Sequence, residues 1–339
     1  MARKKPTISD VAKFADVSTA AVSMVLSGKG RISSWTTRRI NEAIDQLGYV
    51  RNNNAATLRS GKTGLIAVLV HGIAHPDNIE MLQGVNARLD QEGKVAFILF
   101  YENQSDITTR LNVALNYNVD GVLIMDGSAS VDAVEQRLLQ RHIPCIVLTA
   151  APQPNKNHQF SIHTFEGAAL ATQHFVNNGH RHIGFIGGDE NRWDRIEKLA
   201  GYFSVLKNHN IEESRELIIA GSSRPLELEN CVRELLTTHP WVTALLCYDT
   251  DTTKSVITAI KNAGRNIGKD NYIRRDISVI CLEKMDDGGL LSPTITCLDF
   301  SMWQLGWNSA HQLSLQVDEC AGNADNLAPT PQLLLRDSA

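Results

Sequence analysis

The feature that most constrains the fold is a series of short, near-continuous apolar runs that starts at residue 65 and alternates with amphipathic stretches. Such runs are typical of strands buried on both faces of a parallel sheet, and the stretches between them suit crossover helices. We therefore expect an α/β unit with about seven strands. The expected strands are 65–70, 95–100, 121–125, 145–148, 183–186, 244–247 and 277–281. The expected helices include 78–92, 131–141, 165–178, 195–208 and 250–263.

A stretch rich in Pro, Asn, Gln and His, residues 151–159, divides this series near its middle. About seven strands are more than one small sheet needs, so we expect two doubly wound lobes with a cleft between them. Clefts at the carboxyl ends of parallel strands bind ligands. The sequence thus predicts a small-molecule site formed by both lobes.

Residues 7–48 predict a different unit, made of three short helices without a strand. Thr7 followed by Asp10 indicates a capping box, and Ser18 is placed as the N-cap of a second helix. The third helix ends at Gly48. Two helices separated by a tight turn and braced by a third make a helix-turn-helix unit.

Positive charge is concentrated in this N-terminal unit. Residues 1–62 carry eleven Lys or Arg and four Asp or Glu, a net charge of +7, whereas the whole chain carries −4. A basic module on an acidic body is typical of a protein that binds a polyanion, because its cations release condensed counterions from phosphates. Residues 51–64 are polar and glycine-containing, as a domain linker would be. We expect a DNA-binding headpiece at 1–50, a hinge at 51–62 and a ligand-binding body at 63–339.

Several classes of protein are disfavoured by the sequence. No run of about 18 apolar residues occurs, and the basic start lacks the apolar stretch of a secretory signal, so we expect a cytoplasmic protein. The six cysteines are widely spaced, which favours reduced structural thiols. The glycines at 184–188 lack the spacing of a dinucleotide site, and the histidine pairs lack further metal ligands. No nucleophile, base and orienting group stand at convincing spacing, so we expect no enzyme activity, cofactor or metal.

A set of motifs falls along most of the chain. It includes 8–12 (ISDVA), 17–23 (VSTAAVS), 26–28 (LSG), 47–49 (LGY), 119–124 (VDGVLI), 178–188 (NGHRHIGFIGG) and 199–202 (LAGY). Over residues 7–336 the chain resembles the lactose-repressor (LacI/GalR) family of transcriptional regulators. Segments 26–33, 195–198 and 247–248 look most like the subgroup of maltose-regulon repressors.

The resemblance implies a fold: a three-helix headpiece followed by a periplasmic-binding-protein-like domain of two doubly wound parallel-sheet lobes. Lobe 1 would comprise about 63–162 and 292–322. Lobe 2 would comprise about 163–291 and 323–339. Dimerisation would use the first lobe.

The resemblance also implies that the second helix enters the major groove of double-stranded DNA. Many members have an Arg where Met24 stands; an Arg reads guanine, whereas a thioether packs on thymine methyls. The alternative, that Met24 only packs against the first helix, stays open. Asp16 replaces the glycine usual in the turn, and Asp tolerates a left-handed conformation. The residues implied to contact DNA here are Thr7, Ser18, Thr19, Ala20, Ser23, Met24 and Arg31.

Leu58 falls at the hinge-helix position of the family, where an apolar wedge enters the minor groove. Asn52, Ala55 and Arg59 would face the DNA backbone beside it. A helix this short is unstable alone in water, so it would form only on DNA and next to a second copy. The resemblance therefore implies a homodimer on a pseudo-palindromic operator, and the chain carries no heptad tail for tetramers. An exposed leucine in a linker is the alternative.

The resemblance places an effector site between the lobes. Lys198 stands where the family usually has Arg, Asp249 where it often has Asn, and Glu283 where it often has Asp. Polar pairs with an aromatic suit a mono- or disaccharide, although each residue could instead be a solvated surface charge. The implied effector-binding residues are Asp77, Asn78, Asp126, Trp193, Arg195, Lys198, Asp249, Glu283, Phe300 and Met302.

The implied mechanism couples these sites. Ligand changes the relative pose of the lobes, the hinge helices form or melt, and DNA affinity shifts. A free-standing sugar receptor of the same two-lobed fold is disfavoured by the basic headpiece. An enzyme acting on a small metabolite is disfavoured by the lack of a catalytic constellation.

Overall fold

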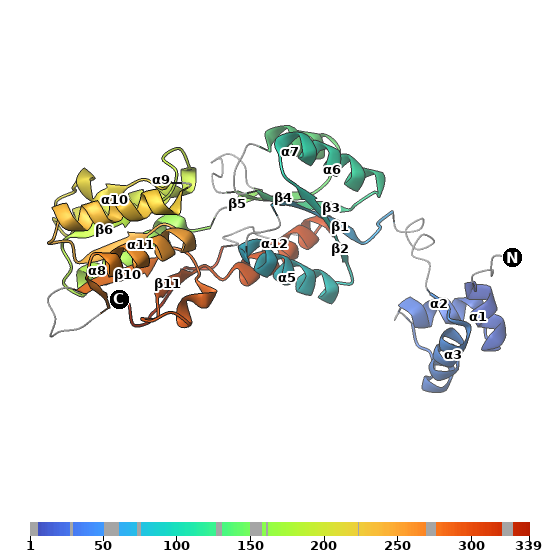
Figure 1. Cartoon of the computed structure of the whole chain (residues 1–339). Coiled ribbons are helices and arrows are strands. Elements are labelled where there is room, and N and C mark those ends of the chain that lie inside the picture. Colours follow the sequence, from blue (N-terminus) through green and yellow to red (C-terminus); the bar gives the residue numbers. More distant parts are fainter. Residues whose placement is uncertain are drawn as a thin grey trace. The chain divides into compact units, whose positions relative to one another are not determined.

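The computed structural model describes residues 6–27, 30–50, 61–72, 76–126, 131–149, 158–160, 162–222, 224–268, 276–320 and 328–339. The chain divides into two compact units, Met1–Thr63 and Gly64–Ala339, which are described separately (Figure 1). The hinge residues expected from the sequence, Asn52, Ala55, Leu58 and Arg59, lie outside the described residues.

Three helices form the first unit around a small apolar core. Val11, Val22 and Ile40, one from each helix, are completely buried. Because helices of this length are marginal alone in water, the shared core stabilises them together. The predicted helix-turn-helix unit is confirmed. Its helices are α1 (Ile8–Phe14), α2 (Thr19–Ser27) and α3 (Ser34–Leu47).

The local signals that start these helices are also present. Thr7 and Asp10 form a capping box, in which the Thr7 backbone N–H donates to Asp10 Oδ2 at 2.8 Å. Ser18 Oγ accepts from a backbone N–H in the first turn of α2 at 3.1 Å. Asp16 takes a left-handed φ of 50° in the turn. Each of these was expected from the residue type alone.

The second unit contains two sheets, each flanked by helices (Figure 1). The first sheet has the strand order β2-β1-β3-β4-β5, and its neighbouring strands are parallel. This is the doubly wound order in which ligands bind where the strand order reverses. Its strands are β1 (Leu65–His71), β2 (Val95–Tyr101), β3 (Gly121–Asp126), β4 (Cys145–Thr149) and β5 (Gln159–Phe160). The helices between them are α5 (Pro76–Gln91), α6 (Gln104–Asn116) and α7 (Asp132–Gln140).

The second sheet has the order β12-β11-β10-β8-β6-β7, with β9 paired to β10. Its strands are parallel except β12, which is antiparallel to β11. The strands are β6 (Ile183–Ile186), β7 (Ile218–Ile219), β8 (Ala244–Cys247), β9 (Asn266–Ile267), β10 (Asp276–Cys281), β11 (Thr296–Asp299) and β12 (Gln332–Leu334). The helices are α8 (Thr164–Asn177), α9 (Trp193–Asn208), α10 (Pro225–Thr238) and α11 (Thr250–Asn262), with short 3₁₀ turns η1 (Arg215–Leu217) and η2 (Asp286–Gly289). The last helix, α12 (Met302–Val317), follows β11 but lies against the first sheet. All seven strands expected from the apolar runs are present.

The chain returns from the second sheet to the first later than the sequence predicted. The expected boundary placed 292–322 in the first lobe, but β11 pairs with β10 in the second sheet. Cys297 and Leu298 are completely buried, so the backbone of β11 must find its hydrogen bonds in a sheet. α12 then packs on α5 and contacts β3 and β4. The crossing therefore lies between β11 and α12.

α5 and α12 pack at close range through two glycines. A Cβ on Gly84 would collide with the carbonyl oxygen of Trp303, and a Cβ on Gly306 would collide with the carbonyl oxygen of Met81. Each helix thus presents a glycine to the backbone of the other. This close contact holds α12 on α5, beside the first sheet.

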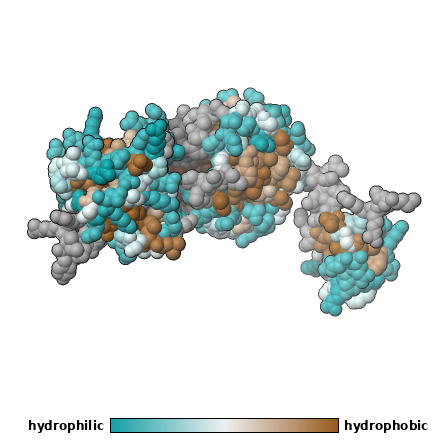
Figure 2. Space-filling model, in the orientation of Figure 1, coloured by the Kyte–Doolittle hydropathy of each residue, from teal (hydrophilic) through white to brown (hydrophobic). Residues whose placement is uncertain are grey.

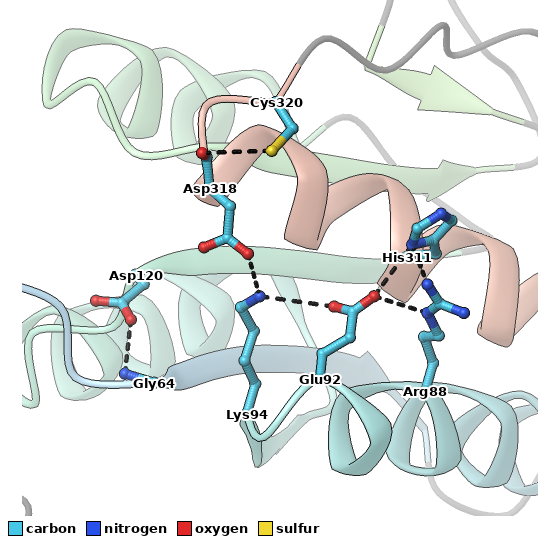
Figure 3. A network of polar contacts seen from close by, with 8 residues as sticks. All are labelled: Gly64, Arg88, Glu92, Lys94, Asp120, His311, Asp318 and Cys320. Atoms are coloured by element: carbon cyan, nitrogen blue, oxygen red, sulfur yellow. Dashed lines mark hydrogen bonds and ion pairs between the residues drawn. The ribbon is translucent and has the colours of Figure 1, made fainter. Parts of the chain in front are cut away.

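A network of ionic contacts joins the end of α5 to α12 (Figure 3). Glu92 Oε1 accepts from Arg88 Nε at 2.7 Å and lies 3.0 Å from His311 Nδ1. Lys94 Nζ lies 2.6 Å from Asp318 Oδ2. Burial alone would raise the pKa of the Glu92 carboxyl, but its hydrogen-bond partners and Lys94 together hold that pKa below its ordinary value.

The point where the chain enters the second unit is fixed by a carboxylate. The backbone N–H of Gly64 donates to Asp120 Oδ2 at 2.7 Å (Figure 3). Asp120 directly precedes β3, and Gly64 directly precedes β1. The start of the predicted body, two residues after the predicted hinge, is therefore tied to the central strands of the first sheet.

Candidate functional sites

The outward face of α2 carries small side chains. Ser18, Thr19 and Ala20 are exposed and Ser23 is half-buried, whereas Val22 points into the core. A helix of this kind brings its backbone close to a groove of DNA, because no bulky side chain intervenes. The DNA contacts of these residues remain predictions.

Met24 lies on the same helix and is 41% exposed. It approaches Gly30, where an added Cβ would lie 2.7 Å from Met24 Sδ. The apolar cluster that fills the headpiece is made by other residues, among them Val11 and Ile40. The exposure of Met24 favours a side chain that points to the surface over one that packs against the first helix.

The headpiece also carries basic and aromatic side chains at its surface. Arg31 and Thr7 are exposed. The Arg39 guanidinium stacks on the ring of Trp35, 4.6 Å from its centroid, and Trp35 is 64% exposed. Exposed cations of this density on a small unit suit contact with phosphates.

In the second unit, the carboxyl ends of three parallel strands bring polar residues together. Lys198 in α9 is only 3% exposed. Its Nζ donates to the carbonyl oxygen of Tyr248, which follows β8, at 2.9 Å and to Glu283, which lies just beyond β10, at 3.3 Å. The same Nζ lies 4.0 Å from the centroid of the Tyr248 ring. Lys198 thus joins the ends of β8 and β10.

A second charge pair extends this cluster. Arg192 holds Asp194 through two hydrogen bonds, Nε to Oδ1 at 2.9 Å and Nη2 to Oδ2 at 3.2 Å. The Tyr248 hydroxyl also donates to Asp194. Burial alone would raise the pKa of Asp194, but the hydrogen bonds from Arg192 and Tyr248 lower it. Burial first, and then the hydrogen bond to Asp194, raises the pKa of the Tyr248 phenol. At neutral pH, Asp194 is therefore an anion and Tyr248 is a neutral hydrogen-bond donor.

Two glycines after β6 make room for the rest of the cluster. Gly187 and Gly188 have φ of 103° and 75°, which favours glycine. A Cβ on Gly188 would lie 2.7 Å from Arg195 Cδ, and Arg195 donates from Nε to the Gly187 carbonyl at 2.9 Å. Asp249 caps α11 by accepting from the Thr252 N–H at 2.7 Å.

The first sheet contributes fewer of the expected residues. Asp77 and Asn78 lie in the first turn of α5, and Asn78 donates to the carbonyls of His71 and Gly72 at 3.0 and 2.8 Å. Asp126 is the last residue of β3, and its side chain lies outside the described parts. Asn78 therefore links the start of α5 to the carboxyl end of β1.

Phe300 and Met302 are buried in the structure. They are 5% and 4% exposed and belong to the main apolar core. The Phe300 ring packs against Gly167 of α8 and fills the space that a side chain would occupy there. Contact of Phe300 and Met302 with an effector stays a prediction. Trp193, at the start of α9, is 47% exposed, so its ring is accessible for stacking on a ligand.

The structure adds Arg192 and Tyr248 to the site predicted from the sequence. Tyr248 directly follows an expected strand, so the strand-end rule could have found it. Arg192 carried no such signal, since its position depends on the partner Asp194. Within the described residues, no group of three or more His, Cys, Asp or Glu could hold a metal ion. None of the described helices is long and apolar enough to span a membrane.

A helix-turn-helix unit followed by a two-sheet α/β unit with polar residues at its strand ends is the architecture of a ligand-controlled transcription regulator. Residues 63–332 match the family described as periplasmic binding proteins and sugar binding domain of LacI family, and residues 7–52 match bacterial regulatory proteins, lacI family. The chain belongs to the LacI family. It is a DNA-binding transcription regulator and not an enzyme.

Individual proteins are similar over nearly the whole chain. The maltose regulon regulatory protein MalI of Escherichia coli (strain K12) is 29% identical over 335 residues, 98% of each chain. The structure of the lac repressor dimer bound to operator and the anti-inducer ONPF has a TM-score of 0.78 at 22% identity, covering 99% of both chains. The transcriptional regulator CelR in complex with cellobiose has a TM-score of 0.67 at 22% identity, covering 98% of this chain and 100% of that one.

Proposed function

We propose that this regulator is a cytoplasmic repressor that binds a pseudo-palindromic operator as a homodimer and is controlled by a small sugar effector. The observation that carries the proposal is the presence, on one chain, of a basic helix-turn-helix unit and a polar cluster at the strand ends of an α/β unit. The first supplies affinity for operator phosphates, and the second supplies hydrogen-bonding groups for hydroxyls. The MalI and CelR relatives support a sugar as the ligand.

Selection from a randomised DNA library tests the operator. The full chain should enrich a site with two inverted half-sites, and the logarithm of its affinity should fall linearly with the logarithm of salt concentration. Enrichment of a single asymmetric half-site would contradict a dimer. Binding without salt dependence would contradict phosphate contact by the headpiece.

The dimer is proposed to form through the first sheet. β2 is an edge strand of that sheet, and Val95, Ile98 and Phe100 on it are 56%, 38% and 37% exposed. Figure 2 shows a hydrophobic patch over the part of the second unit that contains this strand. An exposed apolar edge strand invites pairing unless it is covered, so a second copy is its proposed occupant. Ile98→Asp should shift the sedimentation coefficient to that of a monomer, whereas Leu139→Asp, at an exposed leucine of α7, should not.

The hinge is proposed to act as the family resemblance implies. Leu58 would wedge into the minor groove, with Asn52, Ala55 and Arg59 beside it on the backbone. Leu58→Ala should weaken specific binding more than non-specific binding, while Val50→Ala, at an exposed position of the headpiece, should affect neither. Equal losses of affinity for specific and non-specific DNA would contradict the proposal that Leu58 enters the minor groove.

Coupling between the sites is proposed to run through the segment after β10. Glu283 contacts Lys198 in the cluster, and Lys284 contacts Glu80 of α5, beside the first sheet. An effector that binds beside Glu283 and shifts it would move Lys284 with it. The pose of the first sheet, and through Gly64 the hinge, would then change.

A further inference from the structure

An aromatic ring and a guanidinium form an exposed pair on the first turns of α3. Arg39 follows Trp35 by four residues, so both side chains lie on the same face of the helix, where the guanidinium stacks on the ring. Trp35 is the most exposed of the described tryptophans. The core of the headpiece is filled by other side chains, so the pair is available to a molecule outside the headpiece.

The stacked arrangement leaves the charge of Arg39 available as well. The carboxylate paired with it in the described headpiece is that of Asp16, 4.0 Å from Nη2, and the Asp16 side chain is 92% exposed. Water screens an ion pair at that separation, so Asp16 binds the guanidinium weakly. Stacking uses the flat face of a guanidinium and leaves its N–H groups, which lie in its plane, open to an acceptor.

Contacts at both ends of the pair place it beside α2. At one end, Arg39 meets Asp16, which lies in the turn before α2. At the other end, Gly30 stands five residues before Trp35 and lies against Met24, where an added Cβ would be 2.7 Å from Sδ. The two helices also pack on each other. The pair therefore runs alongside the helix that is expected to enter the major groove.

The chain around the pair is basic. Residues 31–41 contain Arg31, Arg38 and Arg39 and no acidic residue. Arg31 and Arg38 are exposed, and the first acidic residue of α3, Glu42, comes after its second turn. Phosphates complement such a surface, because cations that neutralise them release condensed counterions.

From these contacts we infer that Trp35 and Arg39 bind the sugar-phosphate backbone of DNA at the edge of the groove that α2 is proposed to enter. The inference deepens the proposed function and rests on it. Arg39 donates to a phosphate oxygen, while the Trp35 ring packs on a deoxyribose and its indole N–H adds a further donor. Backbone groups are the same at every base pair, so this contact supplies affinity and register without reading the sequence.

The fluorescence of Trp35 tests the contact directly. Trp35 is the only one of the five tryptophans within residues 1–63, so the difference in emission between the wild type and Trp35→Phe isolates its signal. Acrylamide is a neutral quencher that DNA does not repel. It should quench this signal about threefold less when the selected operator is bound, because a ring packed on the backbone is shielded from solvent. Equal quenching with and without DNA overturns the inference.

A second tryptophan variant is the matched control for this measurement. Trp241→Phe removes an exposed tryptophan from the second unit and should leave the protection by DNA unchanged. If Trp241→Phe abolished the protection while Trp35→Phe retained it, the shielded ring would lie outside the headpiece and the inference would fail.

The salt dependence of binding tests the charge. Arg39→Gln should lower the slope of log affinity against log salt concentration by about one for each subunit. Arg233→Gln, at an exposed arginine of α10, should leave the slope unchanged. Methylphosphonates placed along the operator then locate the contact: one neutralised phosphate in each half-site should weaken binding of the wild type but not of Arg39→Gln. An unchanged slope in Arg39→Gln, at a retained melting temperature, overturns the inference.

Trp35→Ala separates a backbone contact from base recognition. It should weaken binding to the selected operator and to unrelated DNA by a similar factor, about fivefold, because a backbone contact forms on either. Trp35→Phe keeps a ring but lacks the N–H donor, so its affinity should lie between those of the wild type and Trp35→Ala. A loss confined to the operator would assign base recognition to Trp35 and overturn the inference.

Failure of the inference and failure of the proposed function give different results. If the operator is bound with a steep salt dependence while Trp35 stays open to acrylamide, the inference is overturned and the DNA-binding repressor stands. If no DNA is bound, the proposed function itself fails. Protection of Trp35 in the free protein would assign the pair to a contact within the protein, which also overturns the inference.

Discussion

Lys284 Nζ lies 2.9 Å from both carboxylate oxygens of Glu80, joining the segment after β10 to α5. Both side chains are 27% exposed, so water only partly screens the pair. The residue before it, Glu283, holds Lys198 in the charged cluster. One short segment therefore contacts the candidate effector site and the helix beside the first sheet.

Breaking this link should weaken the coupling between effector and operator. A half-buried pair of this kind is worth about 1 kcal/mol, so Lys284→Met should reduce the effector-induced change in operator affinity about fivefold. Operator affinity is measured by fluorescence anisotropy with and without the tightest-binding sugar. Lys254→Met is the control, because it breaks the exposed Lys254–Asp287 pair without crossing between the sheets. Equal effects of both variants would refute a transmitting role for Lys284.

Gly84→Ala should destabilise the second unit although Ala is normally the better helix residue. The new Cβ would collide with the Trp303 carbonyl, and overpacking of this kind costs about 1–3 kcal/mol. Chemical denaturation measures the change. Gly289→Ala, where nothing lies within 4 Å of the added Cβ, should be nearly neutral. If Gly84→Ala left the free energy of unfolding unchanged, α5 and α12 could move apart without loss of stability.

Met24→Arg should move the base preference of the headpiece toward guanine at one symmetric position of the operator. An Arg at an exposed site of α2 can donate two hydrogen bonds to guanine, a discrimination of about 1–3 kcal/mol. Repeating the library selection with the variant shows the preference. Gln46→Arg adds the same charge on α3 and should strengthen binding without a new base preference. An unchanged profile for Met24→Arg would place residue 24 away from the groove.

Acid should destabilise the second unit through Glu92. Its folded-state pKa lies below the ordinary value of 4.5, so its ionised form stabilises the fold above that pH. This contribution is lost as the pH falls from about 4.5 through the lower folded-state pKa, because protonation is then favoured by unfolding. Melting temperatures from pH 7 to pH 3 should fall less steeply in Glu92→Gln than in the wild type. Glu234→Gln, at an exposed glutamate of α10, should follow the wild-type curve.

The parts of the fold that the sequence predicted are those with a local signal. The buried strands, such as β1 and β8, are almost entirely apolar because both of their faces are covered. The caps at Thr7 and Ser18 depend on residues within three positions of them. Such features do not need the rest of the molecule to be known.

The missed parts depend on distant partners. α12 buries the polar side chains Ser309, Gln312 and Ser314 together with apolar ones, which hides its helical pattern. The position of Phe300 is a similar case, since an aromatic after a strand can stack on a ligand or fill a core. Its contact with Gly167 of α8 depends on a residue more than 100 positions away in the chain.

Glu283 and Lys284 are neighbours in the chain, yet their ion-pair partners belong to different layers of the protein. Which partner each meets is set by the count of residues after β10. Inserting or deleting a single residue there would misdirect both charges at once, whereas exchanging one side chain would remove only one contact. The loop is thus a spacer of fixed length, and evolution can vary its composition more freely than its size.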